Sequence, residues 1–422
     1  MRRYLEEAIS RSIQESWKSS EEFAPGKTRI PLAVPPFGEE EVLEVMDSFL
    51  SLNLTMGKKV EKFEKMFADY IGTRSAVMVN SGSSANLLAL SVLANPGTEN
   101  RLTAGDEVIT PALTWVTTVY PIVNVGAVPV LVDVDPETFD IDPTRIVDAV
   151  GPRTRAIMLV HLLGNPCDMD ALLKIAEEHR LFLVEDACEA HGATYRGKRV
   201  GSFGDLATFS FFLSHHISTI EGGMVVTSNE TYTELARALR AFGWIRDLQK
   251  RDSIAEEYPS IDPRFMFINI GFNMRPTEIQ GALGIHQLRK LDAFIEKRRE
   301  NVAYWNDRFR KHDRFFQLPE ETRHSRHVYF GYALTIKEDA PFTKEEVTRY
   351  LESKLIETRP VMAGNIVEQP VAQVLPHRVV GSLTHAHRIM HQSFFFGNHQ
   401  KVGAKEREYI ADCIDDFIDS RT

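Results

Sequence analysis

Residues 76–93, AVMVNSGSSANLLALSVL, place a short apolar run, a turn of small hydroxylated residues and a helical pattern in direct succession. Similar apolar runs, separated by helical patterns, continue to about residue 230, at 107–110, 128–132, 156–160, 181–184, 206–211 and 223–227. Their hydrophobicity is continuous rather than alternating, which is typical of strands buried on both faces. Because the intervening helices would form βαβ crossovers, the sequence predicts an α/β fold with a mostly parallel sheet.

Helical periodicity recurs on either side of this region, at 38–50, 60–72, 277–290 and 292–309. An N-terminal helix is also expected, exposed to solvent. Residues 244–267 are charged and interrupted by proline, so we expect an irregular segment that is functional or faces a partner. These patterns predict an N-terminal extension, a large domain and a smaller α+β domain, at 1–35, 36–284 and 285–422.

Composition excludes several classes of protein. The 422 residues carry 49 basic and 59 acidic side chains, a net charge of -10, which argues against a partner that is a nucleic acid. No apolar stretch approaches the ~18 residues of a membrane helix, and the N-terminus lacks the apolar centre of a signal peptide. The three cysteines, Cys167, Cys188 and Cys413, are too few and too scattered for a disulfide framework. We therefore expect a cytoplasmic protein.

The turn at residues 80–86, NSGSSAN, is a candidate phosphate site. A strand-to-helix turn of small residues offers free backbone N–H groups, serine hydroxyls and the positive end of the helix dipole. Serine is also a good helix cap, so a simple cap explains the turn equally well.

A candidate cofactor contact lies in residues 184–192, VEDACEAHG. Ligands of open α/β sheets bind outside the carboxyl ends of the strands, and Asp186 is at such an end. A carboxylate there can keep a pyridine nitrogen protonated, which makes the ring an electron sink. The alternative is an aspartate that caps a helix.

Two adjacent histidines, His215 and His216, occur in residues 208–223, TFSFFLSHHISTIEGG. Adjacent positions do not share one helix face, so the two are a poor pair of metal ligands. An exposed imidazole at the edge of the sheet would suit acid/base chemistry, since it titrates near neutral pH. A purely structural histidine is the other interpretation.

The order and spacing of these three segments resemble the sugar aminotransferase and dehydratase family of fold-type-I pyridoxal-phosphate enzymes, over residues 30–415. The resemblance implies the aspartate-aminotransferase-like fold, a mixed and mostly parallel sheet flanked by helices, with pyridoxal or pyridoxamine phosphate as the cofactor. It also implies a set of residues that bind the phosphate, stack on the ring, pair with its nitrogen or lie close by: Gly82, Ser83, Ser210, Trp115, Asp186 and Glu189.

Residues 271–276, GFNMRP, resemble a loop by which an asparagine of one subunit reaches the phosphate of its neighbour. The match implies this role for Asn273 and a homodimer with shared active sites. Arg275 and Arg359 lie in matching motifs and are candidates for binding the nucleotide diphosphate or the glutamate carboxylate. Ordinary surface ion pairing is the alternative for both arginines.

The informative departure is at position 215. Aminotransferases of the family carry a lysine there, whose amine forms a Schiff base with the cofactor, whereas this chain carries His215. The segment resembles instead the 3-dehydratase branch that acts on GDP-4-keto-6-deoxymannose. Further segments match that branch: 53–57 (NLTMG), 163–166 (LGNP), 359–360 (RP) and 396–400 (FGNHQ).

This branch implies a reaction in which His215 takes a proton from the methylene carbon of pyridoxamine phosphate and protonates the departing C3 hydroxyl. The product would be a 4-keto-3,6-dideoxy sugar, and L-glutamate would regenerate the amine form of the cofactor. Two alternatives stay open, an aminotransferase that makes a 4-amino sugar and a catalytically silent scaffold. The nucleotide also stays open among GDP, CDP, dTDP and UDP.

A related branch acts on CDP-4-keto-6-deoxyglucose, shares the histidine and carries an iron–sulfur cluster. Its additional cysteines fall in the region corresponding to 245–265, where this chain has none. The chain therefore cannot supply the four thiolates of such a cluster, and no iron–sulfur cluster is expected.

A second group of histidines, His385, His387 and His391, lies in the stretch THAHRIMHQS. His387 and His391 have the i, i+4 spacing of a metal pair, but the stretch offers neither a third ligand nor a neighbouring acid. We therefore expect no metal, and histidines at the surface or at an interface.

Overall fold

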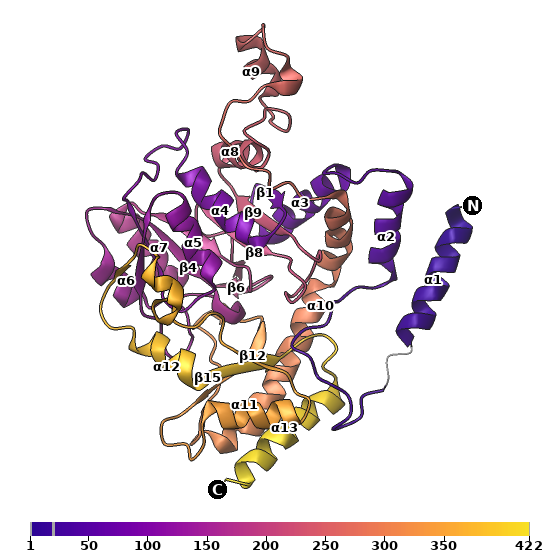
Figure 1. Cartoon of the computed structure of the whole chain (residues 1–422), viewed down its shortest axis with the longest axis vertical. Coiled ribbons are helices and arrows are strands. Elements are labelled where there is room, and N and C mark those ends of the chain that lie inside the picture. The colour runs from indigo at the N-terminus through magenta and orange to yellow at the C-terminus, as the bar shows by residue number, and fades with distance from the viewer. Residues whose placement is uncertain (1, 19–21, 422) are drawn as a thin grey trace.

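The computed structural model describes residues 2–18 and 22–421. Its centre is an eight-stranded sheet in the order β1-β9-β8-β5-β4-β2-β3-β14 (Figure 1). The strands are β1 (Ser75–Val79), β2 (Glu107–Pro111), β3 (Val128–Val132), β4 (Thr154–Val160), β5 (Phe182–Asp186), β8 (Leu206–Ser210), β9 (Gly223–Thr227) and β14 (Arg378–Val379). β9 pairs antiparallel with β1 and β8, and the other neighbours are parallel. All seven predicted apolar runs are strands of this sheet, which confirms a mixed and mostly parallel sheet.

Side chains of one strand reach helices on both faces of the sheet, which explains the continuous hydrophobicity. In β5, Val184 belongs to a core with α4 and α8, whereas its neighbour Leu183 belongs to a core with α6 and α7. The helices of this region are α2 (Glu39–Leu50), α3 (Lys58–Ile71), α4 (Gly82–Leu93), α5 (Val116–Asn124), α6 (Pro143–Ala149), α7 (Met169–His179) and α8 (Glu230–Arg240).

The C-terminal part forms a second, antiparallel sheet in the order β10-β12-β15-β13. Its core surrounds the fully buried Trp305, whose ring meets Tyr332 and Phe396 edge-on. This sheet lies below the large one in Figure 1, with α11 and α13 beside it. The elements are β10 (Phe316–Gln317), β12 (Gly331–Ile336), β13 (Thr358–Pro360), β15 (Ser393–Gly397), α11 (Lys344–Ser353), α12 (Thr384–Gln392) and α13 (Ala404–Asp419). A three-stranded sheet joins β11 (Ser325–Arg326), β6 (Thr194–Tyr195) and β7 (Lys198–Arg199).

One long helix connects the two sheets. The helical segments predicted at 277–290 and 292–309 form one continuous helix, α10 (Glu278–Phe309), and Leu291 between them is fully buried. Thr277 caps it, with the side chain of Gln280 bonding back. The predicted boundary at 284/285 falls inside this continuous helix, and β14 crosses from the C-terminal part into the large sheet. The division into domains stays a prediction, and α10 and β14 both connect the two predicted domains.

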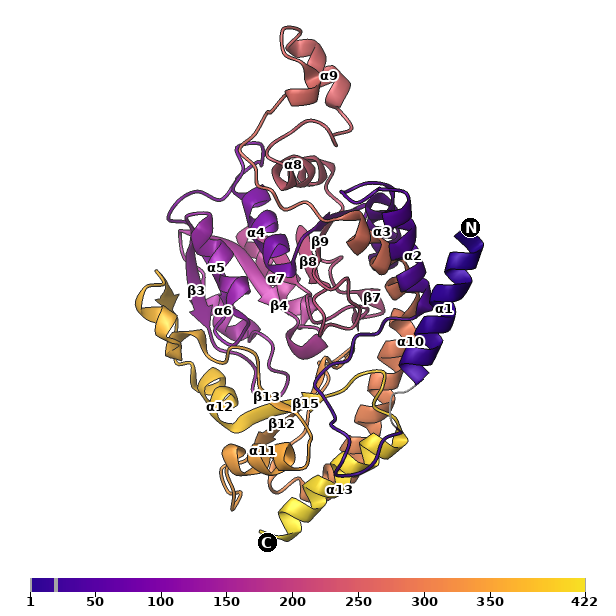
Figure 2. The same cartoon turned by 45° about the vertical axis from the view of Figure 1, so that its right-hand side comes forward.

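Residues 244–267 leave the body of the molecule as an arm, seen at the top of Figures 1 and 2. They contain a short helix, α9 (Arg251–Glu257), where the sequence predicted an irregular segment. No residue of α9 is fully buried, but Ile254 and Ala255 pack against a small apolar cluster made by Ala238, Ile245, Leu248 and Met266. At the other end of the chain, the predicted N-terminal helix is α1 (Arg2–Lys18), which runs beside α2 in both views. Among the described helices, none has the length and hydropathy needed to span a membrane.

Candidate active site

A pocket of about 870 Å³ opens at the carboxyl ends of β4, β5 and β8, where the two sheets face each other. Its lining comes from the ends of these strands, from the first turns of α4 and α5, and from the C-terminal part of the chain. Eight of the predicted site residues line it: Gly82, Ser83, Trp115, Asp186, Glu189, Ser210, His215 and Arg359.

At one end of the pocket, helix α4 begins against the end of β8. Ser81 caps the helix, and its hydroxyl accepts a hydrogen bond of 3.1 Å from the Ser84 backbone N–H. A Cβ at Gly82 would lie 2.5 Å from the Cβ of Ser210, so only glycine lets the two elements approach this closely. Because the first N–H groups of a helix have no intrahelical acceptor, Gly82, Ser83 and Ser210 form a site suited to an anion. The helix cap and the phosphate site are therefore compatible interpretations of the same turn.

Asp186 is the last residue of β5 and is held by donors from three directions. Its Oδ2 accepts hydrogen bonds of 2.8 Å from the Asn86 amide and from the Thr118 hydroxyl. Its Oδ1 accepts the Cys188 backbone N–H at 3.1 Å. The Asn86 carbonyl in turn accepts from the Thr208 hydroxyl of β8 at 2.5 Å. This network fixes the direction of a carboxylate that lines the pocket and is only 5% exposed.

Glu189 lies beside Asp186 in the same wall. Burial raises the pKa of its carboxyl to about 8, the Leu163 backbone N–H at 2.7 Å opposes the shift, and the Asp186 carboxylate adds to it. Glu189 is therefore protonated at neutral pH and can donate a hydrogen bond.

The loop between β8 and β9 sends the two adjacent histidines to different environments. His216 is fully buried, and its Nε2 lies 3.1 Å from the Val328 carbonyl oxygen. His215 is half-buried and lines the pocket, with its ring centroid 5.3 Å from that of Phe330. The structural interpretation therefore fits His216, and the acid/base interpretation stays a prediction for His215.

His215 is held in its neutral form. Burial lowers its pKa to about 3, and the positive charge of Arg298 acts in the same direction. Arg298 is itself buried, and its guanidinium donates to the backbone carbonyls of Tyr329 and Phe330 at 3.2 and 2.9 Å. Within the described residues, the Nδ1 atom of His215 has no hydrogen-bond partner. The pKa of His215 therefore lies below the near-neutral value on which the acid/base interpretation of the sequence rests, and its imidazole is neutral at physiological pH.

The pocket fits a phosphorylated pyridine cofactor. The close approach of Gly82 to Ser210 at the start of α4, here called the glycine cradle, suits a phosphate. The ring of Trp115, half-exposed at the cap of α5, offers a face for stacking. The Asp186 carboxylate provides an acceptor for a ring N–H, at a distance from the cradle set by β5 and β8. No lysine is among the residues that line the described pocket.

Comparison with known proteins identifies the family. The model of the DegT/DnrJ/EryC1/StrS aminotransferase family matches residues 36–415. The chain belongs to this family. The match includes the pocket and both sheets, so the fold is that of the fold-type-I pyridoxal-phosphate enzymes, as predicted.

Within the family, the chain is similar to dehydratases. It is 40% identical over 374 residues to GDP-4-keto-6-deoxy-D-mannose 3-dehydratase of Yersinia pseudotuberculosis, with 88% of this chain and 94% of the relative covered. It is 38% identical over 414 residues to dTDP-4-dehydro-2,6-dideoxy-D-glucose 3-dehydratase of Saccharopolyspora spinosa, with 95% and 89% covered. A crystal structure of GDP-4-keto-6-deoxymannose-3-dehydratase with a trapped PLP-glutamate geminal diamine has a TM-score of 0.85 at 36% identity, covering 91% of this chain and 99% of that one.

Two of the predicted site residues, Asn273 and Arg275, are not among the residues that line the pocket of their own chain. Asn273 is exposed and accepts a hydrogen bond of 3.1 Å from Arg275, whose guanidinium lies 5.0 Å from the centre of the Phe242 ring. Arg359 does line the pocket, but its guanidinium is paired with Glu357 at 2.6 Å. The proposed roles of these residues stay predictions.

Sequence reasoning missed three residues that organise the site. Asn86 closes the quoted NSGSSAN turn, and its spacing from Ser81 could have placed it near the strand ends. Thr118 and Arg298 carry no such signal, because each acquires its role through a partner far away in the sequence.

Proposed function

We propose that this protein is a pyridoxal-phosphate-dependent nucleotide-sugar 3-dehydratase, with GDP-4-keto-6-deoxymannose as the substrate. It would remove the C3 hydroxyl and release a 4-keto-3,6-dideoxy sugar. The observation that carries the proposal is His215, a neutral imidazole that lines the cofactor pocket at the position of the aminotransferase lysine. The named activities of the two similar dehydratases support the same reaction class.

Different residues of the pocket would hold the cofactor and move protons. Gly82, Ser83 and Ser210 would hold the phosphate, and Asp186 would keep the ring nitrogen protonated. When bound, pyridoxamine phosphate supplies an amine and a ring that accepts electrons. His215 would take the proton from the methylene carbon and deliver a proton to the hydroxyl that leaves from C3 as water.

The absence of a lysine amine at position 215 suits elimination rather than amino transfer. A lysine would capture the aldehyde form of the cofactor, whereas the imidazole of His215 leaves it free to exchange. L-Glutamate would then restore the amine form, and the glutamate adduct named for the solved dehydratase supports this donor. Arg359 would bind substrate or glutamate once its guanidinium leaves Glu357.

We further propose a homodimer in the cytoplasm. Asn273 is exposed on its own chain, and the preceding residues include the exposed apolar side chains of Phe267, Ile268 and Ile270, of which Ile270 is 93% exposed. A second copy would cover these side chains and receive Asn273 at its phosphate site. The three unpaired cysteines suit a reducing compartment and are too few to ligate an iron–sulfur cluster.

One incubation separates the proposal from its alternatives. The protein is mixed with pyridoxal phosphate, L-glutamate and GDP-4-keto-6-deoxymannose in deuterated water, and the products are identified by mass spectrometry and NMR. A dehydratase gives 2-oxoglutarate, ammonia and a sugar with deuterium at C3. Accumulation of a 4-amino sugar would identify an aminotransferase, and no turnover with the GDP, CDP, dTDP or UDP substrates would identify a silent scaffold.

The role of His215 has its own test. His215→Asn should still bind the cofactor, because the phosphate and ring contacts are unchanged, but should lose about 100-fold or more in dehydration rate. Cofactor binding is followed by absorbance, and His179→Asn, at the exposed end of α7, serves as the matched control. Unchanged dehydration in His215→Asn would remove this residue from the mechanism.

A further inference from the structure

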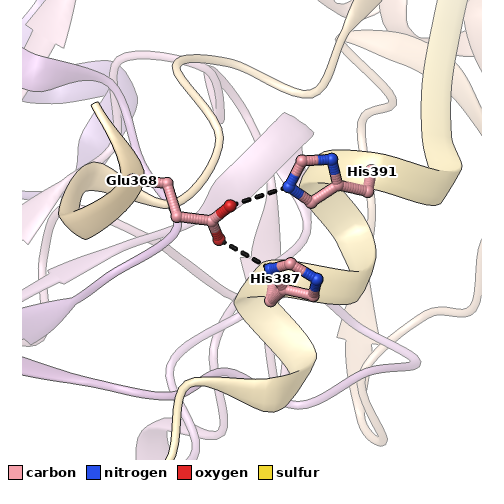
Figure 3. A group of neighbouring side chains, drawn as sticks. All are labelled: Glu368, His387 and His391. Carbon is pink, nitrogen blue, oxygen red and sulfur yellow. Dashed lines mark hydrogen bonds and ion pairs between the residues drawn. The ribbon is translucent and has the colours of Figure 1, made fainter. Parts of the chain in front are cut away.

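A cluster of two histidines and one glutamate lies outside the pocket. His387 and His391 are one turn apart on α12, and their ring centroids are 4.5 Å apart. Glu368 ends a short 3₁₀ helix, η4 (Ile366–Glu368), and its carboxylate points at both rings (Figure 3). Its Oε1 lies 2.9 Å from Nδ1 of His387, and its Oε2 lies 2.7 Å from Nε2 of His391.

This arrangement corrects the premise on which the sequence predicted no metal. The stretch around His387 and His391 contains no acid, but the fold supplies Glu368 from a segment 19 residues before the first histidine. Within the described residues, no lysine or arginine forms an ion pair with Glu368. The Asn365 amide donates to the same Oε1 that contacts His387, at 2.9 Å, and so helps to orient the carboxylate.

We propose that Glu368, His387 and His391 form a binding site for a divalent transition-metal ion such as Zn²⁺. Two imidazole nitrogens and one carboxylate oxygen are ligands that Zn²⁺ prefers, and a water would complete a tetrahedral set. Ligand atoms of such a site are about 3.3 Å apart when each lies ~2.0–2.1 Å from the metal. Here the three ligand atoms all lie within 4.8 Å of one another, so small side-chain rotations suffice.

The ion would act as a structural clip between two segments. The Ile366 backbone N–H of η4 donates to Ala112, at the end of β2, and the N-terminus of α12 donates two N–H groups to Asp133, just beyond β3. Both segments therefore already rest on the large sheet, and the metal would close the loop between Glu368 and His387. Because the ion would bind the folded chain and not the unfolded chain, it would raise the free energy of unfolding. None of the three ligands lines the active-site pocket, so the site is separate from the proposed reaction.

The test measures metal binding directly on the cofactor-loaded protein, free of affinity tags. Equilibrium dialysis against Zn²⁺, followed by elemental analysis, should give one tightly bound equivalent per chain. His387→Asn, His391→Asn and Glu368→Gln should each weaken binding by at least about tenfold, the lower end of what loss of a mere supporting group costs. His179→Asn removes an exposed histidine elsewhere and should bind as the wild type does.

Two further readouts report the coordination itself. Co²⁺ in place of Zn²⁺ should give the visible absorption of a tetrahedral nitrogen and oxygen site, and Zn²⁺ should raise the melting temperature of the wild type but not of His391→Asn. Absence of stoichiometric Zn²⁺ binding in the wild type, or full binding by the three ligand variants, would overturn the proposal.

Discussion

Replacing His215 by asparagine should flatten the dependence of stability on pH between pH 7 and pH 5. Burial and the charge of Arg298 lower the folded-state pKa of this imidazole from 6.5 to about 3. Between these values the unfolded chain binds a proton at His215 that the folded chain does not bind. Stability therefore falls as the pH drops through 6.5, and it continues to fall until the folded-state pKa is reached.

The magnitude follows from the pKa difference. A pH of 5 lies 1.5 units below the unfolded-state pKa of 6.5, so the imidazole is protonated in the unfolded chain, whereas in the folded chain His215 is still neutral. At about 1.4 kcal/mol per unit, this group costs the wild type about 2 kcal/mol on going from pH 7 to pH 5. The result is insensitive to the depth of the shift, because any folded-state pKa well below 5 gives nearly the same figure.

The assay is urea unfolding of the cofactor-free protein, followed by tryptophan fluorescence at several pH values between 5 and 7. The other buried histidines are present in both proteins, so the difference between the wild-type and His215→Asn profiles isolates this side chain. His179→Asn should reproduce the wild-type profile. Parallel profiles for the wild type and His215→Asn would refute the claim that the folded protein holds His215 neutral, and with it the argument for a proton acceptor.

Three further predictions concern the pocket. Gly82→Ala should lower the affinity for pyridoxal phosphate by about tenfold or more in a fluorescence titration, because the new Cβ would lie 2.5 Å from that of Ser210. Thr118→Val removes one of the donors to Asp186, and a lost bond to a charged group costs about 1.5–3 kcal/mol, to be measured as weaker cofactor binding. The carboxyl of Glu189 has a pKa of about 8 and is protonated only in the folded state between pH 5 and 8, so the free energy of unfolding falls by about 1.4 kcal/mol per unit as the pH rises over this range. Glu189→Gln should remove this decline, and urea unfolding at each pH would measure it.

Local patterns were sufficient for seven of the eight strands of the large sheet, all except β14. Continuous apolar runs identified these strands, because burial on both faces favours apolar residues at most of their positions. The family prediction is confirmed by the match over residues 36–415. The same patterns also predicted the long helical region that is α10. They missed α9, because its apolar residues Ile254 and Ala255 pack on a cluster that other parts of the chain supply.

By itself, the sequence determined the family, the succession of strands and helices along the chain, and the presence of His215 where aminotransferases of the family carry a lysine. The resemblance had already singled out His215, and the tertiary structure shows what separates it from His216: the surroundings of each ring include Val328 or Phe330, more than a hundred residues away. Tertiary structure also decided that the acid between His387 and His391 is Glu368. The physical reason is the same in both cases: pKa values and ligand sets depend on distances in space, and a linear pattern records only neighbours along the chain.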